Sequence, residues 1–402
     1  MAIAKGISKQ VAIKKESAYG TLAGATGGRL LRRVTSSFNL TKDTYQSDEI
    51  RTDYQMADFR HGVRSADGSV SGELSPGSYS DLVAAALARS FSAGITVTSL
   101  AFATTATTIV RATGSFLTDG FKIGDVIRIT AATGANANNL NVNLLITNVV
   151  ALTITFVVLN AGTFTASPTV TAATLVVQGK KTFVPTTGHT SDSFTVEEWY
   201  SDIAQSEVFT GCKVNTVGVS IPATGMATMD FGFMGKDLTQ TGTTQYFTTP
   251  TALGTSGVCA GVNGVVVFNG TAVALITDAS ININRNIANA TVLGSNSIAE
   301  SFDGRCLVDG SMSLYFSDAV ARNAFKDETE VSLIFTLTTS NSATAEFVSI
   351  TIPRAKINSA TKADAEQGIT MSCDFQALLA VSGGTGTANE QTTIMIQDSL
   401  AA

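Results

Sequence analysis

The sequence predicts a mainly β fold, and three observations carry this prediction. Thr, Val, Ile, Ser and Gly dominate the composition, whereas Lys and Glu, which are frequent on exposed helices, are sparse. Apolar and polar residues alternate over many short runs, which is the period of a strand with one buried face. Turn-forming residues separate those runs. We therefore expect sheets with one or two short helices beside them.

Length and charge narrow the possible classes of protein. The 402 residues exceed one typical domain, so we expect two. No apolar run reaches the roughly 20 residues of a membrane helix, and the first ten residues lack the apolar core of a secretory signal. We expect no membrane partner and synthesis in the cytoplasm. The net charge of −6, with Arg32-Arg33 as the one minor basic cluster, argues against tight nucleic-acid binding.

The first elements lead into a charged arm. A short strand is predicted at 10–13 and a longer one at 30–40, with a Gly-rich loop between them. Residues 41–74 then form a polar arm that leaves a sheet and returns to it, because ten of the 26 residues from Lys42 to Asp67 are charged, against 14% of the chain. Such a segment cannot bury itself, so we expect a contact surface for other copies, with a merely solvated loop as the alternative. The expected contact residues are Asp43, Asp48, Glu49, Arg51, Asp53, Asp58, Arg60 and Arg64.

An amphipathic helix is predicted at 80–89, with Ser80 as N-cap and Asp81 in the first turn. The next segment, 95–178, has only five charged residues and many short β-runs, with turns such as 133–136 between them. This change of composition predicts a small inserted barrel or sandwich. The domains are therefore expected at 1–94 with 179–402, and at 95–178. Gly124-Asp125 is interpreted as a turn rather than a ligand site.

The remaining strands have one apolar and one polar face. Strands at 213–221 and 227–233 are predicted to form a hairpin with one buried and one wet side. Ser349 and Thr351 repeat the polar pattern, as do alternate residues of 370–376. The segment 67–74 and its following helix recur as 309–316 and a second helix, which suggests a duplication. A connector at 383–387 and a last strand at 392–397 end the chain.

The sequence contains no recognisable catalytic centre. His61 and His189 lie in a charged arm and a Gly-Thr loop, away from any nucleophile motif. Paired carboxylates such as Asp48-Glu49 or Glu197-Glu198 leave a glycosidase open in principle, although the single tryptophan gives little platform for a sugar. Four cysteines lack metal spacing and are expected to be reduced thiols. We expect no enzyme activity, cofactor or metal.

Several motifs together resemble the major tail tube protein of long, flexible-tailed bacteriophages. They are ESAYGT at 16–21, KDT at 42–44, SDEIRTD at 47–53, DFRHG at 58–62 and VSGEL at 70–74. The resemblance spans about 1–95 and 180–380, and a small inserted β-domain is also seen in relatives. It implies a β-sandwich or barrel with flanking helices, forming hexameric rings that stack into a hollow tail tube for DNA ejection.

On this resemblance the arm bridges stacked rings, and polar strand faces with carboxylates such as Glu73 or Asp230 line the lumen. DNA then passes without specific binding, other tail proteins are partners, and the inserted domain decorates the surface of the virion. The alternatives are a phage adhesion protein whose inserted domain binds a host glycan, and a capsid or decoration protein.

Overall fold

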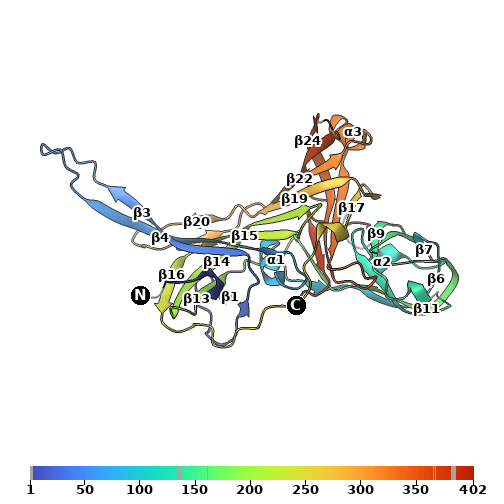
Figure 1. The fold of residues 1–402 in the computed structure, drawn as a ribbon, viewed down its shortest axis with the longest axis horizontal. Coiled ribbons are helices and arrows are strands. Elements are labelled where there is room, and N and C mark those ends of the chain that lie inside the picture. Colours follow the sequence, from blue (N-terminus) through green and yellow to red (C-terminus); the bar gives the residue numbers. More distant parts are fainter. Residues whose placement is uncertain (1–2, 135–136, 161, 365, 367, 382–385) are drawn as a thin grey trace.

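The computed structural model describes residues 3–134, 137–160, 162–364, 366, 368–381 and 386–402. Most of them lie in strands, which confirms the mainly β prediction. A long β-hairpin projects from one end of the molecule and a closed barrel lies at the other (Figure 1). The predicted connector at 383–387 and the turn at 133–136 fall partly outside the described residues.

The main sheet is a continuous antiparallel ladder. Its order is β3, β4, β15, β14, β19, β22, β25, β24, β23, β17 and β18. These strands are β3 (Thr35–Gln46), β4 (Phe59–Glu73), β15 (Thr228–Gly235), β14 (Gln205–Pro222), β19 (Ile276–Asn284), β22 (Leu307–Tyr315), β25 (Thr370–Ala377), β24 (Phe347–Ala363), β23 (Val331–Thr338), β17 (Gly264–Phe268) and β18 (Thr271–Val273). The predicted β14–β15 hairpin is confirmed.

A second layer begins where β14 changes partners, because its first half pairs with two other strands. This layer contains β16 (Asp237–Gly242), β13 (Phe194–Tyr200), β1 (Lys9–Lys15) and β2 (Arg29–Leu30). The last strand, β26 (Met395–Asp398), pairs within the subunit with β24 and with β12 (Lys180–Phe183), which also pairs with β5 (Ser92–Ala93). A separate small hairpin joins β20 (Ala288–Ala290) and β21 (Glu300–Phe302).

The core lies between the apolar face of the main sheet and the second layer. Val70, Val217 and Phe231 of the main sheet are buried in one cluster with Leu82 of the first helix and Val196 of β13. Alternation along each strand supplies one side chain in two to this core, so the other half must face elsewhere.

The helices are short. They are α1 (Ser80–Ala86), α2 (Phe116–Asp119) and α3 (Val320–Lys326). α1 packs against β14, α3 against β24, and α2 belongs to the barrel. α1 ends three residues before the predicted end. Ser80 is the first helical residue rather than the N-cap, which is Tyr79, and Ser80 Oγ accepts a hydrogen bond from Arg29. β4 is followed by α1 and β22 by α3, the order noted in the repeated motif.

The segment after β5 closes a six-stranded barrel, in the order β10, β7, β6, β11, β8 and β9. Its strands are β6 (Thr96–Thr104), β7 (Thr108–Val110), β8 (Val126–Thr133), β9 (Leu144–Val149), β10 (Thr153–Val158) and β11 (Ser167–Val177). Apolar side chains fill its interior, among them Phe116, Phe121, Ile127 and Phe156. The interior is therefore a core and not a binding cavity. The division of the chain into two domains stays a prediction.

One side of the barrel packs against the main sheet. Val126 and Leu145 of the barrel form a buried cluster with Ile334 and Phe347 of β23 and β24. Lys181 Nζ lies 3.1 Å from an oxygen of the buried Asp125 and 3.0 Å from Glu390 at the same joint. The barrel also covers the polar side of β24, so the expectation that Ser349 and Thr351 lie on a wet face is wrong: both are buried.

Candidate assembly surfaces

The charged arm is a long β-hairpin rather than a loop. Its strands pair from Thr35↔Ser71 to Gln46↔Phe59, and residues 47–58 form the tip. The base is anchored because Phe38 is buried within 5.6 Å of the ring centroids of Phe209 and Phe233. Beyond Leu40 the β3 side chains are all exposed. The sequence therefore identified the exposed segment correctly, but the paired strands hold its tip away from the body.

Most of the predicted contact residues lie on this projecting part. Arg51 pairs with Asp53 at 2.9 Å and Arg60 with Asp58 at 2.8 Å, and all four side chains are exposed. These hydrogen bonds from arginine lower the pKa of Asp53 and of Asp58. Asp43, Asp48 and Glu49 are exposed as well. A role of these residues between rings stays a prediction.

Arg64 lies apart from the others, at the base of the hairpin. Its Nη2 atom is 2.8 Å from Asp237 of β16, and both side chains are partly buried. Its backbone N–H donates to the carbonyl of Asn296. This arginine joins the hairpin to the body of its own subunit.

The hairpin also exposes apolar side chains that the sequence reasoning missed. Ile50, Tyr54 and Met56 lie in the tip, and Tyr45 and Phe59 flank it. Their close spacing within the charged stretch was the available signal, since several apolar residues clustered on an exposed segment mark a contact site.

A second candidate surface is the polar face of the main sheet. Eight residues share one row across eight strands: Thr35, Ser71, Asp230, Gly218, Asn282, Asp309, Gln376 and Lys356. The next row contains Glu73, Thr228, Ser220, Ser280, Ser311, Asp374 and Ser359. Short bonds join neighbours, such as Ser280 to Ser311 at 2.8 Å. Small polar groups thus form a continuous face opposite the core.

The two predicted lumen residues, Glu73 and Asp230, lie on this same polar face. The register adds Asp278, Asp309 and Asp374, which the sequence reasoning had not selected as lumen residues. Asp309 accepts a hydrogen bond from Asn282, and Asp374 accepts one from Ser359. Lys356 at the far end of the first row lies 3.6 Å from Glu328. The face is acidic, although which surface lines a channel stays a prediction.

The adjacent carboxylates Glu197 and Glu198 make contacts that stabilise the fold. Glu197 is buried and accepts hydrogen bonds from Ser206 and the backbone of Phe247. Its neighbour Glu198 points to the other side of β13 and pairs with Lys9 at 2.6 Å. The two carboxylates therefore do not face one another across a cleft, as a glycosidase pair would.

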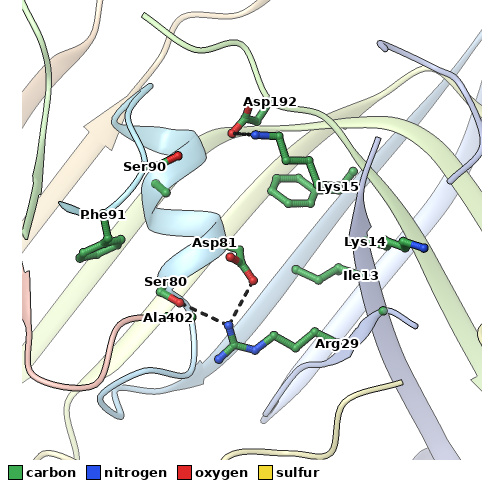
Figure 2. Close-up of a pocket in the computed structure, with 13 residues that line it drawn as sticks. Ile13, Lys14, Lys15, Arg29, Ser80, Asp81, Ser90, Phe91, Asp192 and Ala402 are labelled. Atoms are coloured by element: carbon green, nitrogen blue, oxygen red, sulfur yellow. Dashed lines mark hydrogen bonds and ion pairs between the residues drawn. The ribbon is translucent and has the colours of Figure 1, made fainter. Parts of the chain in front are cut away.

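One pocket lies between α1 and the second layer (Figure 2). Arg29 reaches across it to Ser80 and to Asp81 at 3.1 Å, and also donates to the carbonyl of Gly77. Lys15 pairs with Asp192 at 2.7 Å on its other side. These four charges are thus paired within the subunit, whereas Lys14, which also lines the pocket, donates to the carbonyls of Gly24 and Thr26.

The described residues hold neither a metal-ligating cluster nor a membrane-spanning helix. No group of three His, Cys, Asp or Glu side chains there is placed to hold a metal ion. All four cysteines are free thiols, and burial raises the pKa of Cys259 to about 12. None of the helices in the described ranges has the length and apolar character needed to cross a bilayer.

Comparison with known proteins gives the class to which this architecture belongs. The family model described as phage tail tube protein matches residues 6–377. The chain therefore belongs to the phage tail tube protein family, and it is a structural component of the phage tail within the virion. A search of curated proteins found no match.

Proposed function

We propose that the chain forms hexameric rings that stack into the hollow tail tube of a long, flexible-tailed phage, through which DNA is ejected into the host. One observation carries this proposal: a chain of the tail tube family has both a continuous polar sheet face and a projecting hairpin in the same subunit. A ring needs a uniform inner surface, and stacking needs an element that extends beyond the ring.

The polar face supports the assignment of the lumen. Its carboxylates, including Glu73, Asp230 and Asp309, repel the phosphates of DNA, and its serines and threonines carry no charge. The one cation of the two rows, Lys356, lies 3.6 Å from Glu328. DNA therefore slides past without specific binding. In this proposal the core side of the sheet and the second layer form the wall of the tube.

The hairpin supports the assignment of the contact between rings. Mixed charges at Asp48, Glu49 and Arg51 contribute little singly, but every copy in a ring repeats them. The barrel at 95–178 is the inserted domain in this proposal and lies on the outer surface, at the opposite end of the subunit from the hairpin tip (Figure 1). Synthesis takes place in the cytoplasm of the host.

Negative-stain microscopy of the purified protein tests the proposal directly. We expect the protein to form stacked rings or hollow filaments, either as purified or after it has been concentrated. Particles that stay monomeric under all assembly conditions would contradict it. In filaments, the ring symmetry is read from end-on views, and six subunits are expected.

Charge reversal tests the role of the hairpin. Asp48→Lys with Glu49→Lys and Arg51→Glu should block stacking, while circular dichroism of the monomer stays unchanged because all three side chains are exposed. The matched control reverses Asp318 and Lys326, charges that lie at α3 far from the hairpin. Normal filaments from the hairpin variant would remove the hairpin from the contact.

A further inference from the structure

The hairpin tip carries apolar side chains that its own subunit leaves uncovered. Ile50 is 100% exposed, Tyr54 99% and Met56 59%. Single exposed apolar residues are common, but three within seven residues at the end of a projecting hairpin form an anchor of the kind that fills a pocket on a partner.

The tip is also acidic. Residues 47–58 contain Asp48, Glu49, Asp53 and Asp58 against Arg51, a net charge of −3. Asp53 and Asp58 have arginine partners within the hairpin. Within the described ranges, no cationic group lies within 4 Å of Asp48 or Glu49. The two carboxylates next to Ile50 are therefore available to a cation on another molecule.

An apolar groove with cations beside it is formed near the start of the chain. It has a volume of about 610 Å³ and is formed by the turn Gly6–Ser8, by β1 and β2, and by the segment that precedes β3. Ile7, Val34 and Leu253 line it and are 93%, 58% and 48% exposed. The buried Val11 and Leu31 form its floor. The groove is thus apolar inside and uncovered.

The rim of this groove is basic. Lys9 and Arg33 line it and Lys5 directly precedes its residue Gly6, whereas the other cations of residues 3–34 do not line it. Lys9 is already paired with Glu198 at 2.6 Å, and the backbone N–H of Lys5 donates to Asp202. Arg33 donates only to the carbonyls of Gly6 and Lys9 in the hydrogen bonds of the described chain. No carboxylate of the described residues lies within 4 Å of the Lys5 or Arg33 side chain.

We propose that the hairpin tip of one subunit docks into this N-terminal groove of a second copy. Ile50 and Tyr54 fill the apolar groove beside Ile7 and Val34, and the carboxylates next to Ile50 face the unpaired cations on its rim. The inference rests on the proposed contact between copies through the hairpin, and it names the two surfaces that meet.

Charge distinguishes this groove from two other cavities. The pocket in Figure 2 pairs Lys15 and Arg29 with Asp192 and Asp81, and its Lys14 donates to the carbonyls of Gly24 and Thr26. The carboxylates of Asp81 and Asp192 in its wall repel the acidic tip. A smaller apolar groove of about 220 Å³ beside α3, lined by Phe268, Leu314 and Val320, carries Asp318 at its edge. That carboxylate repels the acidic tip, which makes this groove the matched negative control.

Disulfide trapping tests the docking. Ile50→Cys in one tagged preparation and Val34→Cys in another, both with Cys306→Ser, are mixed, assembled and treated with a mild oxidant. The other three cysteines are buried. We expect a mixed disulfide dimer on a non-reducing gel, and none when Leu275→Cys, in the groove beside α3, replaces Val34→Cys. Cross-linking to position 275 and not to 34, in filaments of normal appearance, would overturn the inference while leaving the tube function intact.

Charge exchange provides a second test that does not depend on cysteine chemistry. Asp48→Lys with Glu49→Lys should raise the protein concentration needed for assembly at least tenfold, and adding Lys5→Glu with Arg33→Glu should restore it to within about threefold. Arg322→Glu with Lys326→Glu, which alters two exposed cations on α3 outside the groove, should not restore it. Restored assembly with this control pair would argue against docking in the groove. So would a failure of the groove pair to restore assembly, provided that the monomer of that variant is folded. If the unmodified protein never assembles, the proposed function itself fails.

Discussion

At the scale of single residues, Glu16 shows how a carboxylate holds two strands and a turn together. Its oxygens accept hydrogen bonds from the backbone N–H groups of Gly20 and Gly211, both at 2.8 Å. They also accept from the hydroxyls of Ser193 at 2.6 Å and Thr195 at 3.0 Å. Glu16 is buried, so these four donors depend on it.

Replacing Glu16 should therefore destabilise the subunit. We expect Glu16→Ala to lower the free energy of unfolding by about 3 kcal/mol, because three buried donors and one partly buried donor lose their acceptor. Urea denaturation of the monomer measures this change. Glu49→Ala, at the exposed hairpin tip, should change it by less than about 0.5 kcal/mol. Equal effects of the two substitutions would show that Glu16 is not the organising group.

Asp398 gives the subunit a pH-dependent stability. Burial raises its pKa to about 6, against the opposing hydrogen bonds from the N–H groups of Gly77 and Leu400. In the unfolded chain an aspartate titrates near pH 4. Between these two values the folded protein binds the proton more tightly, so the contribution of Asp398 to stability is present at low pH and lost as the pH rises through 6.

The variant Asp398→Asn isolates this effect because it cannot titrate. As the pH falls from 7 to 4, the unfolding free energy of the wild type should rise by roughly 2 to 3 kcal/mol relative to the variant. Denaturation curves of both proteins at several pH values measure the difference. A difference that does not change with pH would contradict it, and Asp43→Asn controls for loss of an exposed carboxylate.

At the scale of elements, alternation predicted which strands exist better than it predicted what covers them. The buried and wet sides of β15, and of β14 from Thr216 onward, follow the period of two, since the core lies on one side only there. The first half of β14 is buried on both sides because the second layer covers it. The same pattern in β24 failed at Ser349 and Thr351 because the barrel covers the polar side there. A local pattern carries no information about a layer supplied by a segment some two hundred residues away.

The hairpin offers an element-scale prediction. Gln46 and Phe59 are directly paired, so a two-residue Asn-Gly turn can replace residues 47–58 and keep the register. The variant should fold with unchanged circular dichroism and melting temperature but fail to form filaments, as sedimentation will show. Filaments of normal yield would mean that the tip makes no essential contact. Exchanging two tip residues, Thr52 and Ala57, for serine provides a control that keeps the length.

At the scale of the whole molecule, the candidate surfaces were only partly readable from the sequence. The charged tip was predictable because its residues are contiguous. The N-terminal groove was not, because its cations are spread over about thirty residues and only the pairing of β1 with β2 and β13 brings them together. The polar face needed the register of eight strands, which no short-range pattern specifies.

The proposed lumen gives a prediction for the assembled tube. Asp230→Lys with Asp309→Lys places two cations per subunit in one row of the polar face. Such tubes should retain DNA at low salt and release it as the salt concentration rises, whereas unmodified tubes should not bind it. Co-sedimentation with DNA at several salt concentrations measures this. The same substitutions at the exposed residues Asp318 and Asp327 are the control, and equal retention there would contradict the lumen assignment.

The pairing of β5 with β12 has a consequence for how such a chain can be altered. Ala93 lies directly opposite Lys180, so the chain leaves the body and returns to it at neighbouring positions. A foreign sequence spliced between these two residues would change what the subunit displays without changing the path of the remaining backbone. The inserted domain must present apolar side chains that bury Ile334 and Phe347, as Val126 and Leu145 of the barrel do now. The joint therefore accepts a replacement domain only if its contacting surface is apolar.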